Sequence, residues 1–198
     1  MIRHYTLIAA MFAVAALAGC GSSPKSHFYT LSSGAALERS EAKAQYTVAI
    51  GPVTVPDIID CPQIVTRSGP NQMQIAEQER WASPVKSEIS RVIADSLMQQ
   101  LDGAYVYVYP QFVSLNADYQ VLVEVQRFDS KLGDAVTVEA LWTVRPAQGG
   151  VVKNGRSAVR EPTNGNGYDA LVAAYSRALT AVSRDIAEAI RALGPSSR

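Results

Sequence analysis

The sequence has few of the residues on which catalytic and metal sites depend. Its 198 residues include two histidines and two cysteines, too few for a framework of disulfides. No histidine–cysteine cluster has the spacing of a zinc site, and no acidic loop resembles a calcium-binding hand. A nucleophile activated by histidine would have to use His27, because His4 lies in a segment that we expect to be removed. We therefore expect neither an enzyme nor a bound metal or other cofactor.

The chain also lacks an excess of charge of either sign. Lysine plus arginine number 18, as do aspartate plus glutamate. A domain that binds nucleic acid carries a basic patch or stripe, and the composition shows no such excess. We therefore expect no nucleic-acid partner, and the charge balance identifies no other partner.

The N-terminal apolar run is too short to cross a membrane. Residues 7–19 form a stretch of 13 residues without a charge, whereas a transmembrane helix needs about 20. The run follows Arg3 and ends in the letters LAGC at residues 17–20. A basic start, a short apolar run and small residues at its end are typical of a secretory signal peptide.

The LAGC motif resembles the lipobox of bacterial lipoproteins, in which the cysteine receives a diacylglycerol and the preceding peptide is removed. We predict that residues 1–19 are a signal peptide, that Cys20 is lipidated, and that residues 20–26 tether the domain to a bilayer. Gly21 follows the motif, where an aspartate would favour the inner membrane; the resemblance therefore implies the outer membrane, facing the periplasm. The alternative is an ordinary secretory signal with a chance cysteine. A disulfide between Cys20 and Cys61 stays open only if Cys20 carries no lipid.

Period-2 alternation and turn residues predict a succession of strands. These strands are expected at residues 27–31, 46–55, 63–67, 72–76, 105–109, 118–128, 135–145 and 151–159. Gly51-Pro52 predicts a bulge or an edge in the second strand, and the turn at residues 68–71 predicts a hairpin. The YVYVY segment at 105–109 places three tyrosines on one face, either as sheet surface under a helix or as part of a lipid groove.

Two amphipathic helices are also predicted. The first should begin with Ser83 as its N-cap and Pro84 as its first helical residue, and end before residue 102. Its charged face is expected to carry Lys86, Glu88, Arg91 and Asp95. The second should run from about residue 168 to residue 193 and end at a glycine and a proline. Together the patterns predict one α+β domain over residues 27–195, with a mostly antiparallel or mixed sheet and two main helices packed on it.

One stretch of the sequence is more distinctive than this fold requires. Residues 50–85 read IGPVTVPDIIDCPQIVTRSGPNQMQIAEQERWASPV. The stretch resembles the ABC-type transport auxiliary lipoprotein family, the paraquat-inducible protein C-like lipoproteins that accompany MCE-domain lipid transport systems. The matching positions are residues 51–53, 56, 60, 62–67, 69–71, 77, 80–82 and 84, together with the lipobox and residues 28–31. Cys61 departs from the pattern, because a basic residue is expected there.

The resemblance implies a non-catalytic role. Such a lipoprotein would stand at the outer membrane and bind an MCE-domain protein that, with its ABC transporter, moves lipids between the two membranes. A ring-like homo-oligomer would suit docking on a symmetric MCE assembly. Arg67, Arg80 and Trp81 are candidate partner contacts. A structural interpretation of these residues also stays open, in which Trp81 would pack against the core and an arginine would pair with Glu77.

Two other functions remain as alternatives. The first is a structural outer-membrane lipoprotein of another envelope assembly or secretion machine, with the same anchor and a different partner. The second is a periplasmic enzyme that depends on His27 or an acidic residue.

Overall fold

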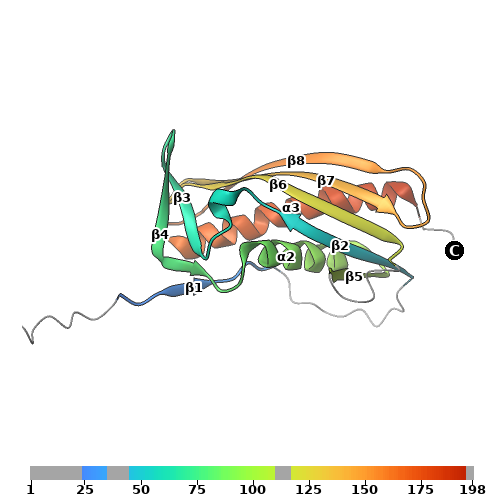
Figure 1. The fold of residues 1–198 in the computed structure, drawn as a ribbon, viewed down its shortest axis with the longest axis horizontal. Coiled ribbons are helices and arrows are strands. Elements are labelled where there is room, and N and C mark those ends of the chain that lie inside the picture. Colours follow the sequence, from blue (N-terminus) through green and yellow to red (C-terminus); the bar gives the residue numbers. More distant parts are fainter. Residues whose placement is uncertain (1–23, 35–44, 110–116, 195–198) are drawn as a thin grey trace, which may run out of the picture.

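The computed structural model describes residues 24–34, 45–109 and 117–194. The predictions for the signal peptide and for lipidation of Cys20 fall outside these ranges. Within them the fold is the predicted α+β domain: two sheets and two long helices (Figure 1).

The strands form two mixed sheets. The first has the order β1-β4-β3 and comprises β1 (His27–Tyr29), β4 (Gln72–Trp81) and β3 (Gln63–Gly69). The second has the order β5-β2-β6-β7-β8 and comprises β5 (Ala104–Val108), β2 (Tyr46–Thr54), β6 (Tyr119–Ser130), β7 (Ala135–Pro146) and β8 (Lys153–Pro162). The pairs β1–β4, β2–β5 and β2–β6 are parallel, and the three remaining pairs are antiparallel.

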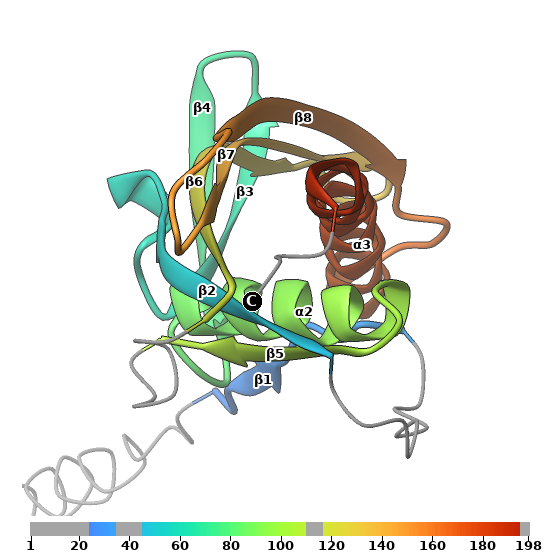
Figure 2. The same ribbon diagram turned by 90° about the vertical axis from the view of Figure 1, so that its right-hand side faces the viewer.

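Two helices, α2 (Val85–Gln100) and α3 (Tyr168–Leu193), cover one face of the larger sheet. In Figure 2 this sheet curves around them, while a short 3-10 helix, η1 (Asp57–Ile59), lies outside the curve. The apolar stripe predicted for the last helix faces the core, since Leu171, Tyr175 and Leu179 are each at most 1% exposed. Burying each such side chain stabilises the fold by about 1.5–3 kcal/mol before the entropy cost of ordering it.

The first helix differs from its prediction in two details. It begins at Val85, and Pro84 rather than Ser83 is the N-cap residue, without a side-chain cap. The main-chain oxygen of Pro84 accepts hydrogen bonds from the amides of Ser87 and Glu88, so the hydrogen bonds of the helix start at Pro84. Glu88, predicted on the charged face, is only 4% exposed. Sequence spacing alone placed it among solvated residues because its buried partner lies 57 residues earlier in the chain.

The strand boundaries also differ from the prediction. The fourth strand extends to Trp81 instead of residue 76, and the last strand covers Lys153–Pro162 instead of residues 151–159. The predicted hairpin of β3 and β4 is confirmed, and it projects from one end of the molecule (Figure 1).

Two glycines are required by the close approach of side chains from neighbouring strands. The predicted irregularity at Gly51 is confirmed by a register shift between Ile50 and Val53, and a Cβ atom at Gly51 would lie 2.6 Å from Leu122 Cδ2. A Cβ atom at Gly155 would lie 2.1 Å from Cζ2 of Trp142. Gly155 thus provides the surface on which the indole ring rests.

The tyrosines of the YVYVY segment do not share one environment. Tyr105 and Tyr109 are 51% and 53% exposed, whereas Tyr107 is 3% exposed and groups with Ala49 and Ala117. The middle tyrosine is therefore packed, and the two outer tyrosines present their rings at the surface of the sheet edge.

Candidate functional site

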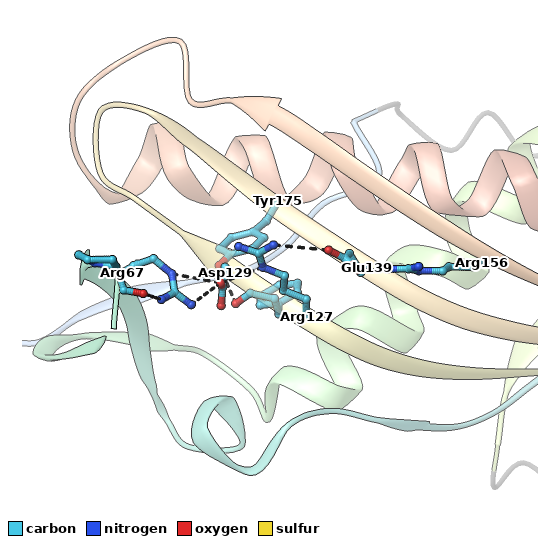
Figure 3. Close-up of polar contacts among 8 residues, drawn as sticks. Arg67, Arg127, Asp129, Glu139, Arg156 and Tyr175 are labelled. Atoms are coloured by element: carbon cyan, nitrogen blue, oxygen red, sulfur yellow. Dashed lines mark hydrogen bonds and ion pairs between the residues drawn. The ribbon is translucent and has the colours of Figure 1, made fainter. Parts of the chain in front are cut away.

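A row of ion pairs crosses the face of the larger sheet that the helices leave uncovered. We call it the ionic ladder; it consists of Arg67 on β3, Asp129 and Arg127 on β6, Glu139 on β7 and Arg156 on β8 (Figure 3). Because Arg67 belongs to the smaller sheet and the other members to the larger sheet, the ladder joins the two sheets.

Asp129 is the centre of the ionic ladder. One of its oxygens, Oδ2, accepts hydrogen bonds from Arg67 Nη2 at 2.6 Å and from Arg127 Nε at 2.9 Å. Arg67 also donates through Nη1 to the main-chain oxygen of Pro70, at 2.9 Å, within the turn of the β3–β4 hairpin. The hydrogen bond with Asp129 is the main cause that raises the pKa of Arg127.

Glu139 links the other two arginines. Its carboxylate oxygens accept hydrogen bonds from Arg127 Nη1 at 3.4 Å and from Arg156 Nη2 at 2.5 Å. The hydrogen bond from Arg156 is the main cause that lowers the pKa of the Glu139 carboxyl, so this carboxylate stays ionised well below neutral pH. Exposed pairs of this kind each contribute little to stability. The ladder therefore matters more for the charge pattern of this face than for its stability.

A β-bulge explains how these side chains reach the same face. In β6 the side chains of Val121, Val123 and Val125 point to the core. A register shift between Val125 and Arg127 changes this alternation. After it Phe128 is 3% exposed, and Arg127 lies on the outer face with Asp129. An extra residue of this kind re-aims the following side chains, so strict alternation could not have predicted the ladder.

An open pocket of about 360 Å³ lies beside the ladder. The pocket is lined by Pro56, Ile58, Ile59, Arg67, Gln126, Arg127, Phe128, Asp129 and Glu139. Ile58 on η1 is 51% exposed, so the pocket combines an apolar rim with a charged wall. A surface of this composition suits a partner that inserts an apolar side chain beside a polar or charged group.

Of the three residues predicted as partner contacts, Arg67 lies in this pocket and the other two do not. Trp81 is 6% exposed, and its ring lies 6.4 Å from that of Phe128 and 6.3 Å from that of Tyr175, between centroids. This packing favours the structural interpretation of Trp81. Arg80 is half-buried on β4, and its Nε donates to the main-chain oxygen of Glu77 at 3.4 Å rather than to the carboxylate.

Beneath the pocket an aromatic stack supports β6. The rings of Phe128 and Tyr175 are parallel within 5°, with centroids 3.9 Å apart, and the Tyr175 hydroxyl donates to the main-chain oxygen of Phe128 at 3.1 Å. Burial raises the pKa of this hydroxyl far above its ordinary value. The stack therefore fixes the strand on which Arg127 and Asp129 stand.

A second polar cluster fastens the N-terminal segment to α2. The Leu31 amide donates to Glu88 Oε2 at 2.9 Å, and Arg91 Nη2 donates to both the Leu31 oxygen and Glu88 Oε2, at 2.5 and 2.7 Å. Leu31 itself is 1% exposed. The next amide, of Ser32, donates to Ser176 Oγ on α3 at 3.1 Å. Both main-chain polar groups of Leu31 are thus held by one ion pair.

The histidine considered as a catalytic candidate belongs to the same N-terminal segment. His27 Nδ1 lies 3.0 Å from Glu79 Oε1, and the Tyr29 hydroxyl donates to Glu79 Oε2 at 2.6 Å. The hydrogen bond from Tyr29 is the main cause that lowers the pKa of the Glu79 carboxyl. These contacts attach β1 to β4 and place the His27 ring beside a carboxylate at the edge of the smaller sheet.

The described ranges contain no group of His, Cys, Asp and Glu that could hold a metal ion. Cys61 is a free thiol of intermediate exposure, and its Sγ lies 3.5 Å from the main-chain oxygen of Gln63. No helix in the part of the chain that the structure describes has the length and hydropathy needed to cross a membrane.

The fold and the pocket define an α+β domain with an open surface site of mixed apolar and charged character. The chain belongs to the family of the ABC-type transport auxiliary lipoprotein component, whose model matches residues 29–187. It is accordingly an auxiliary lipoprotein of ABC-type transport, a class that points to the cell envelope.

Solved structures share the fold. The crystal structure of an uncharacterized protein superposes with a TM-score of 0.70 at 21% identity, covering 84% of this chain and 99% of that one. A crystal structure of a protein from Xanthomonas campestris superposes with a TM-score of 0.62 at 20% identity, covering 81% of this chain and 92% of that one. No curated protein matches the chain.

Proposed function

We propose that this protein is a non-catalytic accessory component of an MCE/ABC-type system that transports lipids between the two membranes. The observation that carries the proposal is the family match over residues 29–187, because it covers nearly all of the folded domain and describes an auxiliary lipoprotein. Lipidated Cys20 would hold the domain at the outer membrane, on the periplasmic side.

The pocket beside the ionic ladder supports a binding role for this component. Ile58 offers an exposed apolar side chain, and the wall opposite it carries charges that are already paired. Charges that are already paired keep their attraction when a partner covers them, whereas an unpaired charge would lose its hydration without compensation. We propose that an MCE-domain protein of the same system binds here, with Arg67 as a contact at the edge of the pocket.

The lipid anchor would reduce the affinity that this interface needs. A tethered domain meets its partner at a high effective concentration, so that a modest interface suffices for assembly. Several copies bound around a symmetric MCE assembly would add avidity in the same way.

Two matched variants test the pocket. Ile58 and Ile75 have similar exposure, 51% and 46%, but only Ile58 lines the pocket. We expect Ile58→Asp to weaken binding of a purified MCE-domain protein by at least about tenfold, since it would bury a charge in an apolar rim. Ile75→Asp should leave the affinity unchanged. Equal affinities for the two variants would place the interface elsewhere on the domain.

A further inference from the structure

The outermost strand of the domain carries an exposed aromatic side chain. Among the strands that the structure describes, β1 is at the edge of the smaller sheet and pairs with β4 alone. Its side chains alternate between the two faces, as strand geometry requires. Tyr29 packs against the core and its hydroxyl donates a hydrogen bond to Glu79, while Phe28 is 65% exposed. Single exposed apolar residues are common on protein surfaces, so exposure alone does not mark Phe28 as a contact residue.

The position of Phe28 is set by the length of chain before β1. Seven residues lie between Cys20 and Phe28, and the eight Cα–Cα steps that join the two positions span at most about 27 Å when fully extended. Releasing β1 to lengthen the segment would break its pairing with β4 and the hydrogen bond from Tyr29 to Glu79, while Leu31 just after it is buried and held by Glu88 and Arg91. Phe28 therefore stays within about 27 Å of a lipidated Cys20, a distance from which the outer face of β1 can reach the bilayer surface.

We propose that the outer face of β1, centred on Phe28, lies against the surface of the phospholipid bilayer that holds the anchor. The inference rests on the proposed lipid anchor. Aromatic rings favour the boundary between headgroups and acyl chains. Two cations are near Phe28 in sequence or register: exposed Lys25 lies three residues before it in the chain, and Arg80 is its register partner on β4. Both can reach lipid phosphates while their aliphatic stems stay near the apolar boundary.

This contact leaves the ionic ladder accessible. In both views β1 lies along the lower margin of the molecule, on the side opposite β8 (Figures 1 and 2). A domain resting on the bilayer through β1 would therefore point β8, with Arg156 of the ladder, away from the membrane. The pocket proposed for the partner is lined by residues of β3, β6, β7 and the segment around η1, so the bilayer contact on β1 and the partner site use different residues.

Fluorescence quenching by brominated lipids tests the contact. Phe28→Trp introduces a probe on β1, and Val151→Trp is the matched control, because Val151 is 67% exposed and lies between β7 and β8. The lipidated full-length proteins are placed in phospholipid vesicles with brominated acyl chains, and the signal of the unsubstituted protein, with its own Trp81 and Trp142, is subtracted. We expect quenching and a blue shift of the emission added by F28W, and neither for V151W.

The outcomes separate the contact from the anchor. If the lipidated protein does not float with the vesicles, the anchor is refuted and the contact with it. If it floats but the emission added by F28W is quenched no more than that of V151W, the contact alone is refuted. Emission of F28W that responds to an added MCE-domain protein and not to brominated lipid would also overturn the proposal, because β1 would then be a protein-binding strand.

Discussion

The ion pair that holds Leu31 gives the sharpest test of how the N-terminal segment is attached. Replacing Glu88 by alanine removes the acceptor of the Leu31 amide and the partner of Arg91. Glu88 is 4% exposed, so water cannot readily take its place. Arg91 is 46% exposed at its side chain and can be hydrated after the change.

The expected loss of stability follows from these contacts. A hydrogen bond to a charged group contributes about 1.5–3 kcal/mol, and leaving a buried donor without its partner costs about 1–3 kcal/mol. Since Arg91 recovers some solvation, we expect Glu88→Ala to lower the free energy of unfolding by roughly 2–4 kcal/mol. Amide exchange of Leu31 should also become faster than that of the central strands.

Asp95→Ala is the matched control. Asp95 belongs to the same helix and forms an i,i+4 pair with the same arginine, at 3.5 Å. Such pairs contribute about 0.3–0.5 kcal/mol, so this variant should unfold at nearly the denaturant concentration of the unsubstituted protein. Urea unfolding and hydrogen exchange measure both effects. Equal losses for the two variants, or unchanged exchange at Leu31, would refute the reasoning.

Two further predictions concern the packing of the sheets. Gly155→Ala should cost about 2–3 kcal/mol in urea unfolding, since its Cβ would overlap the Trp142 ring; an unchanged midpoint would show that the ring has room to move. Glu79→Gln should flatten the acid limb of the stability profile. The pKa of this carboxyl lies below its ordinary value of 4.5, mainly through Tyr29, so its contribution is present above that value and is lost as the pH falls through the lowered pKa. Identical acid limbs for Glu79→Gln and the unsubstituted protein would contradict this prediction.

The elements with a long, regular pattern could be predicted from the sequence. The last helix runs over Tyr168–Leu193 as expected, because its apolar residues recur at helical spacing and Gly194, with a φ of 76°, ends it. The alternation of β6 was also predicted correctly as far as Val125. The bulge beyond Val125 changes which residues face outward, and, unlike the irregularity at Gly51-Pro52, it has no glycine or proline that would mark it in the sequence.

The candidate site could be predicted only in part, because its contacts join distant segments. Arg67 was identified from a motif, but its partner Asp129 lies 62 residues later in the chain. Glu139 and Arg156 are ordinary strand residues until the pairing of β6, β7 and β8 brings them together. Trp81 was identified as distinctive, and its packing against Phe128 and Tyr175 shows a structural reason for a large aromatic side chain there.

The most direct test of the proposed function is a pull-down from mildly solubilised envelopes, with the unsubstituted protein and Cys20→Ala in parallel. The account predicts that an MCE-domain protein is recovered with the unsubstituted protein and is lost or much reduced with Cys20→Ala. Recovery of another envelope assembly or secretion machine, without any MCE-domain protein, would contradict the account and favour a structural lipoprotein.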